Sequence, residues 1–363
     1  MWTVWLAFGQ QLLLTWGSTL PANTGAMPPP WSPVICDATG CTISNAYGVW
    51  NDRKECQARS VTYPRTEEEL LLAVAQANQK KLKVKIVTGF SHSIPKLACP
   101  ETGQSSEYQN STILISTAKY NSGIEVDVKN MIVTTDSGVG LRDLIHKVEE
   151  AGLSLVASPY WEGLSIGGLI STGAHGSSWW RKGGTVHNHV VGLSIVVPAS
   201  ESEGYAKIIR LDTQNPPLNA AKVSLGMLGA ISKVKLSLEA GFKRSITNIF
   251  NDDTRLEDEF MDLARQHEFA DITWYPSMNT TVYRKDDRVP LSSSGDGIND
   301  FIGFGPTAVH ISTSLRASGI SFISPCRINF QLTYSYTYLT PTCGANPHGD
   351  DLKDNFIFVR MSS

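Results

Sequence analysis

The chain has 363 residues, of which 41% are hydrophobic and 18% are charged, and its formal net charge is −3 at pH 7. This length predicts two domains with a substantial buried core, and the composition excludes a disordered chain. The charge balance, with no basic tail or stripe, argues against nucleic acid as a partner.

The first element is an apolar N-terminal segment, "WTVWLAFGQQLLLTWG", which Gln10 and Gln11 interrupt. It is too short to span a bilayer well, and small residues and "MPPP" follow it, as after a cleavage site. We expect residues 1–26 to be a secretory signal peptide, although the usual positive start is missing. A buried helix and a membrane anchor are the alternatives. Sequons at Asn110 and Asn279 fit a glycoprotein of the secretory pathway, either extracellular, in the cell wall or membrane-associated.

Residues 27–56 are expected to form an irregular leader rich in cysteine and proline. The chain has six cysteines but no CxxC pair, so neither a metal site nor a redox dithiol is expected. In an exported chain, disulfides are the better interpretation. One pairing joins Cys36 to Cys41 and Cys56 to Cys99, although sequence alone leaves the connectivity open.

The first predicted helix begins at Thr66. Thr66 and Glu69 make a capping box, and the acidic residues of the first turn favour the positive end of the helix dipole. Residues 81–89 and 111–117 alternate as strands do. Residues 123–138 predict a hairpin that turns at Lys129 and Asn130.

The second half of this region also mixes helices and strands. Residues 141–152 predict a helix that Gly152 closes at the C′ position. Strands are predicted over residues 189–199 and 230–240, with a short helix over 218–226 between them. No repeating βαβ period is visible, so the fold class expected is α+β rather than a doubly wound sheet.

Three segments rich in small residues carry the chemistry: "VTGFSHSIPKL" (87–97), "GLSIGGLISTGAHGSS" (163–178) and "SLGMLGAISKVKLSLE" (224–239). Glycine-rich turns expose backbone N–H groups that bind an anion without any lysine. The GxxxxGK[ST] and GxGxxG phosphate motifs are absent. A purely structural role for one such turn remains an alternative, but three of them at strand edges suggest an extended ligand of dinucleotide length.

At these segments the chain resembles the FAD-linked oxidases of the vanillyl-alcohol-oxidase (PCMH) type, and within them the plant L-gulono-1,4-lactone oxidases. The motifs that carry the resemblance lie between Cys36 and Phe304: "SHSIPKL", "PYWEGLSIGGLISTGAHGSS", "NAAKVSLGMLGAISKVKL", "QHEFADITWYPS" and "VYRKDDRVP". It implies FAD as cofactor, and an aldonolactone and O2 as partners, with ascorbate or an analogue and H2O2 as products.

The resemblance also implies a domain order. Residues 57–240 correspond to a PCMH-type FAD-binding domain of two subdomains, and residues 241–305 to the start of the aldonolactone-oxidase-type substrate domain, or cap. After Gly305 the resemblance stops, so residues 306–363 are expected to form a divergent tail and the cap to be incomplete. We therefore expect weak or no lactone oxidation by this chain.

The site residues follow from the same resemblance. A histidine in the first loop of related oxidases bonds covalently to the flavin, so His92 is expected to do the same or only to hydrogen-bond the cofactor. His175 is expected near the pyrophosphate rather than as a base, and no catalytic residue is assigned. The residues expected to bind FAD are Thr88, Gly89, Phe90, Ser91, His92, Ser93, Pro159, Gly167, Gly168, Ser171, Thr172, Gly173, His175, Gly176, Ser177 and Ile231.

Two other functions stay open. The chain could be another carbohydrate oxidase or dehydrogenase on the same scaffold, because fold does not fix substrate. It could also be an FAD-binding protein with little or no activity. The preferred lactone, the electron acceptor and the oligomeric state are not predicted.

Overall fold

The computed structural model describes eight stretches of the chain, which contain all the elements discussed below. They are residues 34–43, 56–88, 111–159, 164–176, 184–276, 279–294, 327–333 and 336–342. Within these stretches, no helix has the length and apolar character needed to cross a membrane.

A small parallel sheet begins the fold. Its strand order is β4-β6-β5, from β4 (Ser60–Thr62), β6 (Thr112–Ser116) and β5 (Lys83–Val87), and both pairs are parallel. Helix α2 (Glu67–Gln79) is the connection between β4 and β5. Strands that run parallel in one sheet need such a crossover connection. The sequence "EEELLLAVAQANQ" is rich in residues with high helix propensity, which favours a helix there.

The capping box predicted at the start of α2 has one of its two hydrogen bonds in the predicted place. The Thr66 side chain accepts a hydrogen bond from the Glu69 N–H at 3.1 Å, as an N-cap should. The Glu69 carboxylate, however, accepts from the Arg65 N–H at 2.7 Å. The reciprocal bond of the capping box is therefore made one residue before the cap, which extends the ordered turn backwards.

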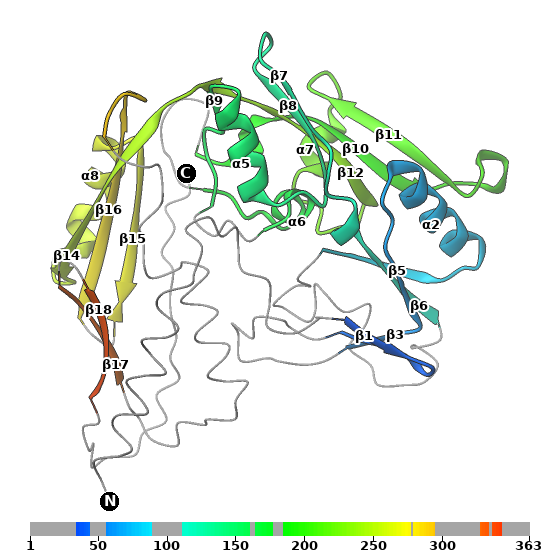
Figure 1. Ribbon diagram of the computed structural model, residues 1–363, viewed down its shortest axis with the longest axis horizontal. Helices are drawn as coiled ribbons and strands as arrows, with labels where there is room; N and C mark the ends of the chain where they lie inside the picture. Colours follow the sequence, from blue (N-terminus) through cyan, green and yellow to red (C-terminus); the bar gives the residue numbers. More distant parts are fainter. Residues whose placement is uncertain are drawn as a thin grey trace, which may run out of the picture.

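A larger antiparallel sheet follows, with the strand order β11-β10-β12-β8-β7 (Figure 1). The hairpin expected over residues 123–138 and the two later strands are confirmed, and one further strand, β11, joins them. The strands are β7 (Ile124–Asp127), β8 (Ile132–Asp136), β10 (Val190–Pro198), β11 (Ala206–Asp212) and β12 (Ala230–Ser237).

Helices cover both faces of this sheet. Along β10, Leu193 and Ile195 belong to the core shared with α5 (Leu141–Glu150), α6 (Ile166–Thr172) and α7 (Pro217–Ala221). The next residue, Val196, instead packs with α2. Since successive strand side chains point to opposite faces, α2 lies on one face and the other three helices lie on the other. Gly152 has φ +76° just after α5, as its predicted C′ position requires.

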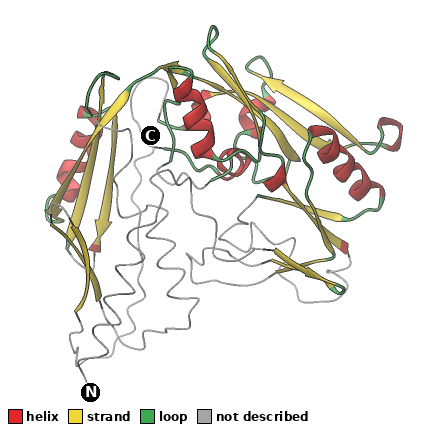
Figure 2. Ribbon diagram, viewed as in Figure 1, coloured by secondary structure: helices red, strands yellow, loops and turns green. Residues whose placement is uncertain are grey.

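The chain then leaves this sheet through a short pair, β9 (Leu153–Ser154) with β13 (Glu239–Ala240). Beyond it, β14 (Lys243–Asp252), β16 (Thr280–Val289) and β15 (Phe269–Tyr275) form an antiparallel sheet in that order. Helix α8 (Leu256–Gln266) packs on this sheet (Figure 2). These elements, called the β14–β16 unit here, lie at the opposite end of the molecule from α2 (Figure 1).

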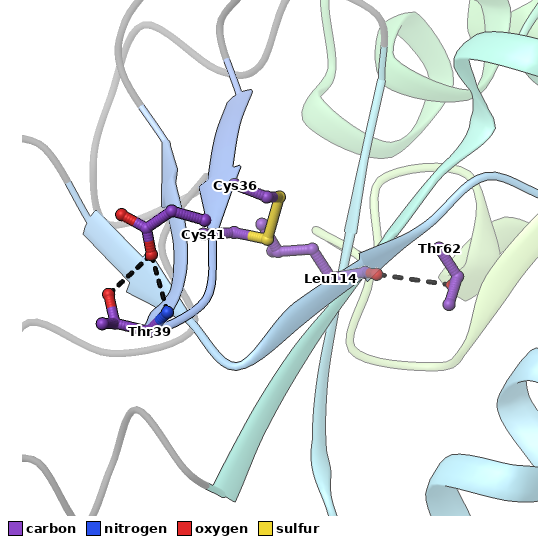
Figure 3. Close-up of a disulfide and its surroundings, with 6 residues drawn as sticks. Cys36, Thr39, Cys41, Thr62 and Leu114 are labelled. Atoms are coloured by element: carbon purple, nitrogen blue, oxygen red, sulfur yellow. Dashed lines mark hydrogen bonds between the residues drawn. A yellow bond between two sulfur atoms is a disulfide. The ribbon is translucent and has the colours of Figure 1, made fainter.

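Two small antiparallel sheets complete the described elements. Near the N-terminus, β1 (Val34–Asp37), β2 (Gly40–Ile43) and β3 (Cys56–Ala58) form a three-stranded sheet. The expected Cys36–Cys41 disulfide closes its first turn (Figure 3); the proposed partner of Cys56, Cys99, lies outside the described residues. Towards the C-terminus, β17 (Arg327–Thr333) pairs with β18 (Tyr336–Thr342).

Candidate cofactor-binding site

The second glycine-rich segment is held against the end of β8. Three backbone hydrogen bonds make this contact. The Gly167 N–H donates to the Ser137 carbonyl at 2.7 Å, and the Ile166 N–H donates to the Val139 carbonyl at 2.9 Å. In the other direction, the Leu141 N–H donates to the Leu164 carbonyl at 2.8 Å. A Cβ on Gly167 would lie 2.8 Å from the Ser137 Cβ and 3.0 Å from its carbonyl oxygen. Glycine is therefore required at position 167, because the two backbones approach closely there.

The link from β8 to α5 contains two residues that the sequence interpretation missed, Ser137 and Gly138. A Cβ on Gly138 would lie 2.0 Å from the Thr117 carbonyl oxygen, so no side chain fits there. The Ser137 hydroxyl is buried and has no hydrogen-bond partner among the described residues. A buried hydroxyl without a partner is costly, which makes Ser137 a residue available to a ligand. The signal was present in the "DSGVG" sequence between a strand and a helix.

The first predicted loop meets this segment at Thr88. The Thr88 methyl group lies 3.5 Å from where a Gly168 Cβ would stand, and the Gly168 N–H donates to the Ser165 hydroxyl at 3.3 Å. The structure therefore brings Thr88 and Gly168 together. The other expected residues of the loop lie outside the described residues: Gly89, Phe90, Ser91, His92 and Ser93.

Ser171 and Thr172 were expected in a turn, and this expectation is wrong. Both belong to the last turn of α6, and both hydroxyls donate to the Gly168 carbonyl, at 3.3 and 2.8 Å. Serine and threonine bond back to the preceding turn when a helix continues through them. Their hydroxyl protons are thus engaged within the helix. Gly173 ends α6 with φ +74°.

The third glycine-flanked segment joins the second at this helix end. The Leu225 N–H donates to the Ser171 carbonyl at 2.9 Å, and a Gly173 Cβ would lie 3.2 Å from Val223. The turn also exposes large apolar side chains to solvent, with Met227 83% exposed. Exposed apolar residues clustered in this way indicate a binding surface. We call them the apolar turn: Val223, Leu225, Met227 and Leu228.

Ile231 and Pro159 each lie next to a residue that contacts the glycine-rich segments or Ser137. Ile231 is itself a core residue of β12, paired with Ile195, while the next residue, Ser232, accepts a hydrogen bond from the Ser137 N–H at 2.8 Å. Gly176 has φ +114°, and a Cβ there would lie 3.0 Å from the backbone of Ser158, which precedes Pro159.

The histidines near α6 have structural contacts. The His175 ring contacts the Gly176 carbonyl at 2.5 Å. The buried His187 ring lies 3.0 Å from the Ile170 carbonyl through Nε2. Burial lowers the pKa of His187, and the nearby His175 and Lys222 lower it further. His187 is therefore a neutral donor beneath α6.

A polar network supports the other side of the site. Lys233 donates to the Asp136 carboxylate at 2.8 Å, and Asp136 also accepts from the Gly123 N–H at 2.8 Å. The Ser232 hydroxyl donates to Glu67 at 2.6 Å. Burial and the charge of Asp136 raise the pKa of Tyr120, which keeps that phenol neutral. These contacts tie α2 to β8 and β12 directly behind Ser137.

Comparison with known proteins defines the class of this site. Residues 58–202 match the FAD binding domain family, so they form an FAD-binding domain. The expected FAD cofactor is thereby confirmed, and with it the α+β fold class of the FAD-binding domain.

The relatives place the chain more narrowly. It is 57% identical to L-gulonolactone oxidase 3 of Arabidopsis thaliana over 86% of this chain and 52% of that protein. It is 44% identical to L-gulonolactone oxidase 2 of the same plant over 78% of this chain and 47% of that protein. The chain is thus similar in sequence to the plant L-gulonolactone oxidases over most of its own length. It spans about half the length of the curated relatives it matches.

Solved structures share the fold at low identity. A solvent-stable cholesterol oxidase superposes with a TM-score of 0.58 and 18% identity over 76% of this chain and 51% of its own. Alkyldihydroxyacetonephosphate synthase does so with a TM-score of 0.54 and 15% identity over 73% of this chain and 52% of its own. At these identities the likeness establishes the fold alone.

The described residues fit FAD. The apolar turn offers a surface to a flat ring system, and it adjoins Gly173, which ends α6. The Ser137 hydroxyl supplies a buried polar group without a protein partner among the described residues. Pockets for cofactors commonly combine an apolar lining with a few placed polar groups.

Proposed function

We propose that this chain is an FAD-dependent oxidase of aldonolactones. The substrate would lose a hydride from a CH–OH carbon and the hydroxyl proton, giving ascorbate or an analogue. FAD, when bound, takes up the two electrons and passes them to O2, which leaves as H2O2. The observation that supports this proposal is the 57% identity to a plant L-gulonolactone oxidase together with the FAD-binding domain.

The residues of the chain would hold and orient the cofactor. Gly167 and Gly168 keep side chains out of the approach to Ser137 and Thr88, so the Ser137 hydroxyl, which has no partner among the described residues, is available to a polar group of the cofactor. The Ser171 and Thr172 hydroxyls donate within α6, and we assign them to the end of the helix rather than to the phosphates. Gly173, Gly176, His175, Ile231 and Pro159 would shape the surrounding backbone.

His92 would attach the flavin covalently. The proposal predicts that flavin stays with the polypeptide through acid precipitation and that His92→Ala releases it. Flavin that is washed out of the wild-type chain by acid would remove the covalent role and leave the binding role to be tested by the holo-protein yield of the same variant.

The lactone chemistry is tested by anaerobic titration of the holo-protein with L-gulono-1,4-lactone. The proposed activity predicts bleaching of the oxidised flavin bands and H2O2 release when air is admitted. Bleaching only by another sugar or alcohol would favour a different carbohydrate oxidase. A bound flavin that neither the lactone nor any other sugar or alcohol bleaches would favour an FAD-binding protein without activity.

The proposal includes passage through the secretory pathway. Asn279, which begins an Asn-Thr-Thr sequon, is exposed at the turn between β15 and β16, where an oligosaccharide has room. An N-glycan-removing enzyme should increase the gel mobility of the chain made in plant cells, and Asn279→Gln should reduce that change. An unglycosylated cytosolic chain that retains Met1 would contradict this part. Fractionation of the same plant cells would show whether the chain associates with membranes through its N-terminal segment.

A further inference from the structure

One arginine stands at the joint between the FAD-binding domain and the β14–β16 unit. Arg288, near the end of β16, makes two parallel hydrogen bonds to the Glu268 carboxylate, at 2.6 and 2.7 Å. Its remaining terminal nitrogen donates to the Glu239 carboxylate at 2.8 Å. The guanidinium fork matches a carboxylate in this bidentate way, which fixes its orientation.

The two carboxylates lie on opposite sides of the joint. Glu268 precedes β15 inside the β14–β16 unit. Glu239 belongs to β13, which pairs with β9 and so is attached to the FAD-binding domain. Arg288 therefore connects the two parts through side chains, independently of the chain that runs between them.

The connecting residues pack around the same guanidinium. The Arg288 guanidinium lies 3.9 Å from the ring centroid of Phe242, and the Phe242 and Phe269 rings stack at 6.3 Å. The Phe269 ring also has the Arg244 guanidinium 4.7 Å and the Arg288 guanidinium 5.7 Å from its centroid. Cation–π contacts of this kind strengthen when they are partly desolvated.

Backbone contacts hold the connection on the FAD-binding side. The Gly241 N–H donates to the Gly152 carbonyl at 2.9 Å, and the Phe242 N–H donates to the Ser154 hydroxyl at 3.1 Å. A Cβ on Gly241 would lie 2.8 Å from that Gly152 oxygen, so the approach depends on glycine. Phe242 is thus fixed to β9, and Arg288 stacks on a ring that cannot move freely.

We propose that Arg288 is the positioning residue that sets the orientation of the β14–β16 unit on the FAD-binding domain. Removing its side chain breaks the bond to Glu239 and the stacking on Phe242, while the strands of each part keep their own pairing. Burial alone would lower the pKa of Arg288, but its two carboxylates raise it overall. The guanidinium is therefore charged at neutral pH. This proposal does not depend on the substrate.

The test measures the orientation directly. Spin labels carried by unnatural amino acids at the exposed positions Ser202 and Asp262, one on each side of the joint, give a distance distribution for the full chain. The wild-type chain should give one narrow peak, and Arg288→Met should lose it in favour of a broad distribution. Arg288→Lys, which keeps the charge but not the fork, should restore it in part.

Two further variants keep the result decisive. Arg255→Met removes an exposed ion pair, to Glu259 at 3.0 Å, that lies wholly within the β14–β16 unit, and it should keep the narrow peak. Glu239→Ala removes the acceptor of the Arg288 bond that crosses the joint and leaves the Arg288–Glu268 pair intact, so it should broaden the distribution, and it decides the result if Arg288→Met unfolds the unit. A narrow wild-type peak that survives in both Arg288→Met and Glu239→Ala would overturn the proposal. A failed lactone titration would not affect it.

Discussion

The FAD-binding domain and the β14–β16 unit are stabilised in different ways. The first buries two apolar core clusters, one on each face of its antiparallel sheet, contributed by several strands and by the helices that cover those faces. The second buries fewer apolar side chains, Leu263, Ile272 and Tyr283, where α8 meets its sheet. Burial of apolar area is the main favourable term in folding, so apolar packing should contribute more to the stability of the FAD-binding domain than to that of the β14–β16 unit.

Charge replaces apolar packing in the β14–β16 unit. Arg284 in β16 is 1% exposed and lies 3.6 Å from the Asp271 carboxylate in β15. Arg288 and its two glutamates add a second charged group at the joint. Removing one partner of a buried pair costs more than the pair contributes to stability. The β14–β16 unit therefore depends more on matched charges, and the FAD-binding domain depends more on apolar packing.

The largest effect should come from the core of the FAD-binding domain. Leu236→Ala removes a fully buried side chain from β12 and should lower the free energy of unfolding by about 2–5 kcal/mol. Leu72→Ala, in α2, removes a side chain that is 57% exposed and should change it by less than about 0.5 kcal/mol. Urea unfolding measures both. Equal effects would contradict the assignment of the core.

The next effect separates ligand approach from backbone strain. Gly173 and Gly204 have φ +74° and +78°, so valine is strained at both. Only Gly173 lies beside the apolar turn, since nothing stands within 4 Å of a Gly204 Cβ. Gly173→Val should reduce the yield of holo-protein much more than Gly204→Val. The flavin-to-protein absorbance ratio measures this yield, and equal losses would place the cofactor elsewhere.

A smaller and local effect is expected in the β14–β16 unit. Leu263→Ala removes a buried α8 side chain that packs near Ile272 and Tyr283 and should cost about 2 kcal/mol, the low end for leucine, because the cluster is small. Amide hydrogen exchange should speed up in α8 and β15 and stay unchanged in β8 and β12. Faster exchange throughout the chain would show that the two parts unfold as one.

The smallest effect is a pH dependence confined to the FAD-binding domain. Burial lowers the pKa of His187 from its ordinary value of 6.5. A base with a lowered folded pKa stabilises the folded state above its ordinary pKa, and this contribution is lost as the pH falls below 6.5. His187→Gln keeps a donor for the Ile170 carbonyl and should flatten the fall in stability below that pH. An unchanged slope would assign the titration to another group.

The sequence predicted the elements whose signals are local. Thr66, Gly152 and the hairpin turn at Lys129 and Asn130 each act within a few residues, and the structure has them as expected. The roles of Ser137 and Gly138 depend on the Thr117 carbonyl and on the N-terminus of α6, which only the tertiary fold brings near. No spacing rule connects those positions.

The same limit explains the errors. Ser171 and Thr172 have the composition of a turn, but the packing of α6 on β12 extends the helix through them, which overrides their weak helix propensity. Three separate small-residue turns predicted one extended ligand, and that prediction stays a prediction. The structure does bring Thr88 beside Gly168 and the third segment beside Gly173, because these glycines stand where a side chain of another segment comes close.

The presence of FAD in the purified chain tests the central claim most directly. The 363-residue chain, expressed and purified without added flavin, should be yellow and show the oxidised flavin absorption bands. After denaturation, the FAD released into solution and the FAD still attached to the polypeptide should together be near-stoichiometric with the protein. Gly204→Val should remain yellow, which shows that a strained glycine substitution alone does not remove the cofactor. A well-folded, colourless wild-type chain that does not take up added FAD would contradict the assignment of the site.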